Sequence, residues 1–275
     1  KTMESFQITH FNLRETLYSG QFFNFREEAN GLYTIVNGGD IFQVKQEENM
    51  IYYVGVDKNY LIDFFGLNFD EKKLSYFSDD VYFKEAFTLY RGLKIMNIDL
   101  FQTIISFVCS AASNQKKIEN NITLISKTFG TFNEKFDIHS FPTPEQILFK
   151  ENSLELLLEC KVGYRAKYIL SICDFLVEYP SYLYEILRGD YTTSHKLLMN
   201  LPGIGSKVAD CICLFGLHHM QAFPVDTWIK KILSTWYGIE GSQKHLELQA
   251  KEKFGHYGGY IQQYLFHYAR EKKLL

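Results

Sequence analysis

A tight turn between two helical patterns constrains the fold of this chain more than any other feature of its sequence. The segment LPGIGS at residues 201–206 follows the apolar spacing of a helix, and helical spacing resumes at Lys207. Pro202 lacks a backbone donor and glycine favours turns, so the segment predicts a helix–hairpin–helix unit. The N–H groups of Gly203 and Gly205 would lie beside a helix N-terminus, where backbone donors bind phosphate. An ordinary helical hairpin is the simpler interpretation of the turn alone.

Lys207 occupies an unusual position for a cation, at the first turn of the second helix. The helix macrodipole places about half a positive charge there. This charge disfavours an ammonium and favours the neutral amine, which is the nucleophilic form. Asp226 follows in the segment PVDTW, where it would cap another helix and stay ionised, and a carboxylate beside an amine nucleophile can stabilise a developing cation. A solvated or phosphate-binding lysine and a purely capping aspartate are the alternatives.

The composition indicates a packed protein and gives no general sign of nucleic-acid binding. Hydrophobic residues make up 46% of the 275 residues, and no apolar run approaches the roughly 18–20 residues that span a bilayer. The five cysteines show no CxxC spacing, which disfavours a disulfide framework, a zinc knuckle and an iron–sulfur cluster and favours a reducing cytoplasm. Because the net charge is -3, binding to nucleic acid requires a local basic face.

The N-terminal part of the chain has the pattern of an antiparallel sheet. Short stretches of β-branched and aromatic residues occupy residues 31–57, and turn signals separate them. The sequence NGG at residues 37–39 is a strong hairpin turn, and EEN at residues 47–49 is a second. We therefore expect an antiparallel sheet domain over residues 1–98.

The remainder of the chain has helical periodicity, which first appears near Val81. Asp99 is expected to cap one helix, Gly130 to end the next, and Pro144 to occupy the first position of a third. We assign residues 99–275 to a helical region that contains the helix–hairpin–helix unit. The fold class is therefore α+β, with the active site in the cleft between the sheet domain and the helical region.

The hairpin, its lysine and the downstream PVD segment together resemble the signature of the helix–hairpin–helix DNA glycosylases, and KVADCICL is most similar to the 8-oxoguanine DNA glycosylases. The resemblance extends over most of the chain, in segments that are weak alone and specific together. These segments are SGQFFNF at residues 19–25, DLFQTIISFVCSAASNQKKI at 99–118, GYRAKYI at 163–169 and GGYIQQYLFHYAR at 258–270.

The resemblance implies a bifunctional enzyme that flips 8-oxoguanine out of double-stranded DNA, excises it and cleaves the strand at the abasic site. Lys207 would attack the sugar C1′ and form a Schiff base, and Asp226 would stabilise the oxocarbenium-like transition state. We expect the enzyme to act as a monomer, away from membranes, in the cytoplasm or on the nucleoid of a prokaryote.

The resemblance also implies a set of residues that hold the flipped base. The backbone carbonyl of Gly20 would accept the N7 hydrogen that distinguishes 8-oxoguanine from guanine. Cys211 and Phe266 would enclose the base between them, and Gln262 would hydrogen-bond its Watson–Crick edge. Cys211 lies four residues after Lys207, so the two share one helix face. Buried packing is the simpler interpretation of Cys211 and Phe266, and a solvated helix residue that of Gln262.

A third set of residues would contact the duplex. Tyr164 would wedge into the stack, Arg165 would face the base left behind, and Asn114 and Lys117 would contact the DNA around that base. Half-buried packing is the alternative for Tyr164.

The backbone carbonyls of Leu201 and Ile204 would hold a structural monovalent cation, as such hairpins often do. No other cofactor is expected.

The chain departs from the better-known eukaryotic-type relatives at the segment SAASNQKK, which we interpret as a prokaryotic-like variant. Ala111 and Ala112 cannot donate hydrogen bonds from their side chains, and Lys117 stands where those relatives use an arginine. We therefore expect a relaxed preference for the base opposite the lesion. Two other functions stay open: a monofunctional glycosylase for alkylated bases, and a non-catalytic helix–hairpin–helix protein that only binds DNA.

Overall fold

The N-terminal sequence forms a five-stranded antiparallel sheet with the order β1-β5-β4-β3-β2 in the computed structural model, which describes residues 2–275. The strands are β1 (Glu4–Gln7), β2 (Phe25–Glu27), β3 (Leu32–Asn37), β4 (Asp40–Glu47) and β5 (Met50–Val54). Asn37 pairs with Asp40 and Glu47 with Met50, so the chain turns at both places that the sequence predicted. A separate two-stranded sheet joins β6 (Phe132–Asn133) to β7 (Ile138–His139).

The centre of the main sheet is covered on both faces. Ile35 and Val36 are neighbours on β3 and point to opposite sides, yet both are fully buried. The short helix α2 (Lys58–Phe64) contributes to this cover, because its Phe64 packs edge-on against Phe42 of β4 with the ring centroids 5.4 Å apart. The sheet pattern did not predict this helix.

Helices dominate the chain from Val81 onward, as the periodicity predicted. The N-terminal part contains α1 (Leu13–Leu17), α2 and α3 (Val81–Leu89). The helices that follow are α4 (Leu100–Ser110), α5 (Gln115–Phe129), α6 (Pro144–Leu148), α7 (Ser153–Glu159), α8 (Arg165–Glu178), α9 (Tyr182–Arg188), α10 (Tyr191–Met199), α11 (Ser206–Gly216), α12 (Thr227–Tyr237), α13 (Gln243–Phe254) and α14 (Gly258–Lys272). Short 3-10 segments are η1 (Ala29–Gly31), η2 (Glu71–Phe77) and η3 (Gly255–Tyr257).

The helix ends follow local signals in the sequence. The Asp99 side chain accepts a backbone N–H of α4 at 2.9 Å. Thr143 and Gln146 form a capping box around Pro144, which occupies the first turn of α6. The N–H of Gly130 closes α5 with a 2.8 Å hydrogen bond to its last turn. The caps predicted at Asp99, Pro144 and Gly130 are therefore confirmed.

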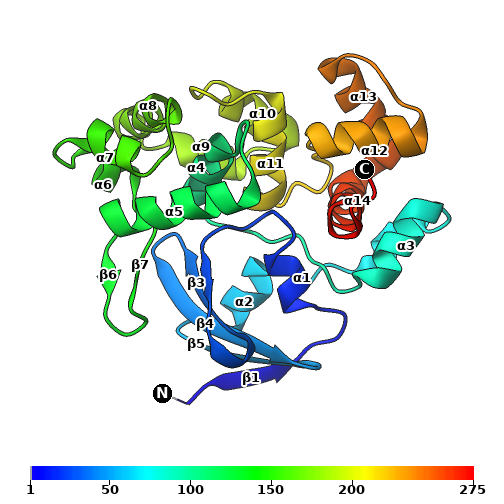
Figure 1. Ribbon diagram of the computed structural model, residues 1–275, viewed down its shortest axis with the longest axis horizontal. Helices are drawn as coiled ribbons and strands as arrows, with labels where there is room; N and C mark the ends of the chain where they lie inside the picture. Colours follow the sequence, from blue (N-terminus) through cyan, green and yellow to red (C-terminus); the bar gives the residue numbers. More distant parts are fainter. Residues whose placement is uncertain (1) are drawn as a thin grey trace.

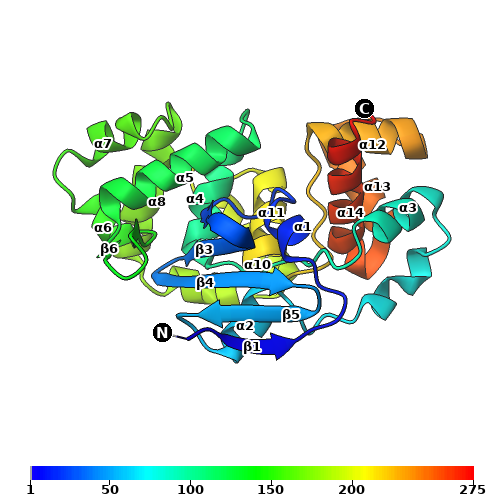
Figure 2. The ribbon, with the colours of Figure 1, turned by 60° about the horizontal axis from the view of Figure 1, so that its bottom comes forward.

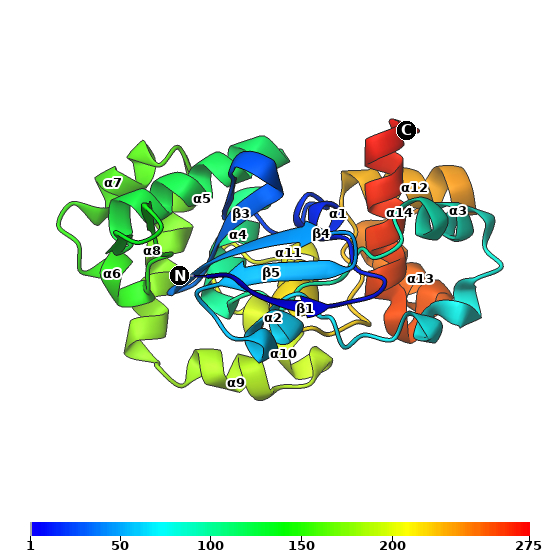
Figure 3. The same cartoon turned by 90° about the horizontal axis from the view of Figure 1, so that it is seen from below.

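Two groups of helices stand on either side of a central space, with the sheet below them (Figure 1). One group runs from α4 to α11, and the other comprises α3 and α12 to α14; Figures 2 and 3 show the same division from two further directions. In the first group, Phe107 of α4 stacks on Phe215 of α11 at 5.5 Å between centroids. In the second, Tyr264 of α14 packs edge-on against Phe83 of α3 at 5.7 Å.

The predicted α+β class, with an antiparallel sheet followed by a helical region that carries the hairpin, is confirmed. The border predicted between residues 98 and 99 falls directly before α4 and stays a prediction. Among the described residues, no helix combines the length and the apolar character that a membrane span requires.

Candidate active site

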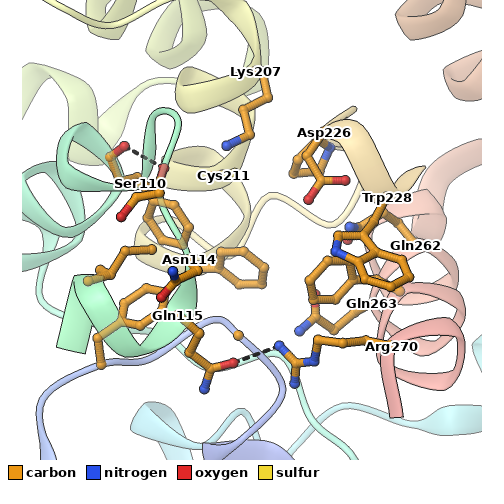
Figure 4. A pocket seen from close by; sticks show the side chains of 18 of the residues that line it. Ser110, Asn114, Gln115, Lys207, Cys211, Asp226, Trp228, Gln262, Gln263 and Arg270 are labelled. Atoms are coloured by element: carbon orange, nitrogen blue, oxygen red, sulfur yellow. Dashed lines mark hydrogen bonds between the residues drawn. The ribbon is translucent and has the colours of Figure 1, made fainter. Parts of the chain in front are cut away.

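The residues predicted to bind the base and carry out catalysis converge on one cavity of about 440 Å³. The cavity opens between the two helix groups, above the N-terminal segment (Figure 4). The predicted residues in its lining are Gly20, Asn114, Lys207, Cys211, Asp226, Gln262 and Phe266. They come from four helices or helix starts and one loop, so only the folded chain brings them together.

Helix α11 supplies the lysine and the cysteine. It begins at Ser206, directly after Gly205, which offers no side-chain cap. Lys207 therefore lies on the first turn, and Cys211 lies one turn further along the same face. The Lys207 amine points into the cavity (Figure 4). Burial raises the pKa of the Cys211 thiol to about 12. Cys211 therefore stays a neutral thiol and forms a soft, polarizable wall.

Asp226 is the N-cap of α12 and faces the same cavity from the other side (Figure 4). Its carboxylate accepts the Ile229 N–H at 2.8 Å, so it does cap the helix as its position suggested. Burial raises the pKa of Asp226, although this hydrogen bond and the nearby Lys207 oppose the rise. The carboxylate thus has two functions available to it: it fixes a helix start and it places a negative charge opposite an amine.

Helix α14 supplies the wall below Asp226. Gln262 is 5% exposed, and its Oε1 has no hydrogen-bond partner among residues 2–275. A buried acceptor without a partner costs about 1–3 kcal/mol, so this oxygen is available to a ligand that brings a donor. Phe266 lies one turn further along and presents its ring to the cavity.

Gly20 lies where the backbone must pass close to α14. Its φ of +84° is in the left-handed region that glycine tolerates. A Cβ at this position would lie 3.1 Å from a ring carbon of Phe266 and 2.9 Å from Nη1 of Arg270. The preceding carbonyl, that of Ser19, accepts the Nε2 of Gln263 at 2.7 Å. The Gly20 backbone is therefore held close to the Phe266 ring.

The cavity also contains polar and aromatic residues to which we assigned no role in base binding or catalysis. Gln115 and Lys116 come from the start of α5, Trp228 from α12, and Gln263 and Arg270 from α14. Arg270 could have been found from the sequence, because it continues the four-residue spacing of Gln262 and Phe266. The remaining lining residues are Phe23, Phe107, Ser110, Ser113, Ile118, Phe215 and Pro224.

The residues predicted to contact the duplex are more dispersed. Asn114 reaches the cavity, but its side chain also caps α5 by accepting the Lys117 N–H at 3.0 Å. Lys117 and Tyr164 lie outside the cavity lining and are exposed, Tyr164 by 62%. Arg165 is only 4% exposed, and its guanidinium donates to backbone carbonyls of Val162 and Ala111. In this conformation Arg165 is thus turned toward the protein.

The hairpin is closed by a hydrogen bond of 3.3 Å from the Ile204 N–H to the Leu201 carbonyl. Gly203 has φ +78° and packs against the Tyr168 ring, and both Gly203 and Gly205 are exposed. No backbone N–H among residues 2–275 donates to the Ile204 carbonyl. The turn therefore has a carbonyl available, which fits a site for a monovalent cation. The described residues contain no cluster of His, Cys, Asp and Glu suited to a metal ion.

Two family profiles match successive parts of the chain. The profile described as 8-oxoguanine DNA glycosylase, N-terminal domain, matches residues 5–104. The profile described as HhH-GPD superfamily base excision DNA repair protein matches residues 105–255.

Individual relatives agree with these profiles. A probable N-glycosylase/DNA lyase of Methanothermobacter thermautotrophicus is 32% identical over 77% of this chain and 74% of its own length. The structure of MBOgg1 in complex with a low affinity DNA ligand has a TM-score of 0.92 at 30% identity, covering 99% of this chain and 97% of that one. The 8-oxoguanine glycosylase/lyase of Clostridium acetobutylicum, in complex with double-stranded DNA containing cytosine opposite to 8-oxoguanine, has a TM-score of 0.89 at 28% identity and covers 99% of each chain.

Proposed function

The chain belongs to the HhH-GPD superfamily of base excision DNA repair proteins, and on this premise we propose that it is a bifunctional 8-oxoguanine DNA glycosylase and lyase. It extrudes the oxidised base from duplex DNA, breaks the bond between base and sugar, and cleaves the strand at the abasic site. One observation carries the proposal: Lys207 and Asp226 face the same cavity as the buried, unpaired amide oxygen of Gln262. A protein that only binds the DNA backbone needs none of these three groups.

The chemistry proceeds through the Lys207 amine. The neutral amine attacks C1′ of the flipped nucleotide, the bond from C1′ to the base breaks, and the base leaves with the bonding electrons and takes up a proton. The amine loses a proton and the sugar ring opens to give a Schiff base between Lys207 and C1′. Loss of a proton from C2′ then expels the 3′ phosphate by β-elimination. Asp226, in its ionised form, stabilises the positive charge that builds up on the sugar.

Recognition of the lesion uses the cavity residues that surround the base rather than the sugar. The Gly20 carbonyl accepts the N7 hydrogen that 8-oxoguanine has and guanine lacks. Cys211 and Phe266 hold the base between a polarizable sulfur and an aromatic ring. Gln262 bonds the Watson–Crick edge with its free Oε1 and its amide nitrogen. These contacts offset the cost of extruding a base, which is about a few kcal/mol.

The duplex is held by residues around the cavity mouth. Tyr164 inserts beside the vacated position, and Asn114 and Lys117 contact the strand that carries the opposite base. Arg165 joins them only when its guanidinium leaves the Val162 and Ala111 carbonyls and turns outward. The exposed N–H groups of the hairpin bind a phosphate.

The carbonyls of Leu201 and Ile204 would hold a monovalent cation at the hairpin, where its positive charge would favour binding of the DNA phosphate. We expect the enzyme to act as a monomer. A reducing compartment such as the cytoplasm fits the five cysteines, which are all free and buried.

Borohydride trapping on a duplex that contains 8-oxoguanine tests the proposed function. Reduction of the Schiff base should yield a covalent enzyme–DNA adduct, and a duplex of the same sequence with guanine should yield none. Base release without an adduct or a nick would contradict the lyase step and support a monofunctional glycosylase. Tight binding with no release from either 8-oxoguanine or an alkylated base would support a protein that only binds DNA.

A further inference from the structure

Arg270 forms a bridge across the wall of the cavity. Its Nη1 donates to the Gln115 Oε1 at 2.7 Å, which Figure 4 shows as a dashed line, and its Nη2 donates to the Tyr18 carbonyl. The guanidinium also lies 5.2 Å from the centroid of the Phe266 ring. One side chain therefore joins three parts of the wall: α14, the start of α5, and the loop that contains Gly20.

Both ends of the bridge are held in place. The Gln115 amide donates its Nε2 to Glu119 at 3.0 Å, which directs its Oε1 toward Arg270. On the other side, the Arg270 Nη2 lies 3.4 Å from Nδ1 of His267, and the Nε2 of His267 contacts Glu15 at 2.5 Å. The Arg270 side chain is 20% exposed, so its hydrogen bonds are largely shielded from water.

The bridge separates two cavities. Gln115 and Arg270 line the active-site cavity and also a second, polar cavity of about 310 Å³, whose other walls include Glu15 and His267. Gln263 also ties α14 to the Ser19 carbonyl, and His267 ties it to Glu15, but Arg270 is the side chain of α14 that contacts both the Tyr18 carbonyl and the Phe266 ring. Nη1 of Arg270 lies 2.9 Å from the point that a Gly20 Cβ would occupy. The guanidinium therefore packs directly against the Gly20 backbone, whose carbonyl is proposed to bind the lesion.

We propose that Arg270 is a positioning residue for lesion discrimination. It fixes the Gly20 carbonyl and the Phe266 ring at the separation that fits 8-oxoguanine, and Gln115 anchors it from α5. The inference rests on the proposed function, because it assumes that the Gly20 carbonyl reads N7. Arg270 itself need not touch the base, since its contacts are with the groups that do.

The test measures discrimination in binding, in the Lys207→Gln background so that no chemistry intervenes. Dissociation constants are determined for two duplexes that differ only in having 8-oxoguanine or guanine opposite cytosine. Discrimination is the dissociation constant for the guanine duplex divided by that for the 8-oxoguanine duplex. Arg270→Met keeps the length and packing of the side chain and removes its donors, and it should lower this ratio by about tenfold. Gln115→Met, which removes only the anchor, should lower the ratio by less, and the double variant should lose no more than Arg270→Met alone.

Arg188→Met on α9 is the matched control, because Arg188 is exposed, contacts Tyr184 and lies outside both cavities. It should leave the ratio unchanged. Thermal unfolding of each variant separates discrimination from stability: a variant with an unchanged ratio and a lowered unfolding temperature has only a structural role. An unchanged ratio in Arg270→Met would overturn the inference, whereas a parent that shows no preference for 8-oxoguanine would instead overturn the proposed function.

Discussion

The wall of the cavity and the face that would meet the opposite base are built differently, although both include the start of α5. In the cavity, Cys211 and Gln262 are each 5% exposed and Gln263 is 1% exposed, so packing holds these side chains before any ligand binds. On the outer face, Lys117 is exposed and Ala112 offers no side-chain donor. The difference indicates that lesion recognition is preorganised, whereas contact with the opposite base depends on few side chains, of which Asn114 and Lys117 are exposed. Substitutions in the two regions should therefore differ greatly in effect.

The largest effect is expected in the cavity, from Lys207→Gln. Without the amine, no covalent intermediate forms, so base release and strand cleavage should both be abolished. Binding of an 8-oxoguanine duplex should stay close to that of the parent, because the base-holding residues are unchanged. Single-turnover cleavage assays and fluorescence anisotropy measure the two properties. A borohydride-trapped adduct in this variant would show that another group is the nucleophile.

The next largest effect is expected from Asp226→Asn. Removal of one preorganised charge typically costs on the order of 10²–10³ in rate. Asparagine caps helices about as well as aspartate, so the unfolding temperature should change little. Single-turnover excision and calorimetry decide between the two functions of this residue. A rate loss that parallels a large loss of stability would assign Asp226 to capping alone.

A smaller, graded effect on the excision rate is expected when the pH is lowered. Burial raises the pKa of Asp226 above its usual value of 3.8, so the carboxylate is protonated at a higher pH than an ordinary aspartate. Below that pKa the excision rate should fall tenfold for each pH unit, because only the ionised form stabilises the cation. The pH–rate profile of Asp226→Asn should lack this limb. If the variant keeps the same acid limb, another group titrates there.

On the outer face, the expected effect of changing the opposite base is small. Asn114 and Arg165 are the remaining groups that could read that base, and loss of one good bidentate contact removes about 1–3 kcal/mol of discrimination. We expect 8-oxoguanine to be excised opposite A, G or T at rates within about tenfold of the rate opposite C. Four duplexes that differ only at this position are compared in single turnover. A preference for C of a hundredfold or more would show that this face is also preorganised.

The smallest effect is expected from Lys117→Ala. Each phosphate contact contributes about 0.9 to the slope of log K against log salt, so this variant should lower the slope by about that amount. Lys45→Ala is the control, because Lys45 pairs with Glu47 on the sheet, away from the cavity. Affinities measured at several salt concentrations give the slope. A parent slope near ten would reveal a much larger basic surface than Lys116, Lys117, Arg165 and the hairpin provide.

Helix α14 shows how far the sequence predicted the site. Gln262 and Phe266 were predicted because residues 258–270 resemble a helix of the family, and their four-residue spacing continues to Arg270. Gln115 could not be found in this way, because the hydrogen bond that places it in the wall joins residues 155 positions apart. The inward orientation of Arg165 was equally hidden, since it depends on the Ala111 carbonyl after α4.

The fold shows the same division between local and distant causes. Both hairpin turns of the sheet and the caps of α4, α5 and α6 follow from residues adjacent in the sequence, and their prediction succeeded. The helix α2 escaped prediction because it has only seven residues and its Phe64 is stabilised by packing on β4 rather than by its own periodicity.

The contacts between α14 and the N-terminal residues 15–20 also determine when the active site can form. Gln263 binds the Ser19 carbonyl across 244 positions, and His267 meets Glu15 across 252. Contacts of such long sequence separation form late, because the intervening chain must first be ordered. During synthesis the sheet and the hairpin can fold as they emerge, but the lesion cavity closes only after α14 has left the ribosome. A chain stalled before this helix would carry the hairpin and its lysine without a pocket to select their target.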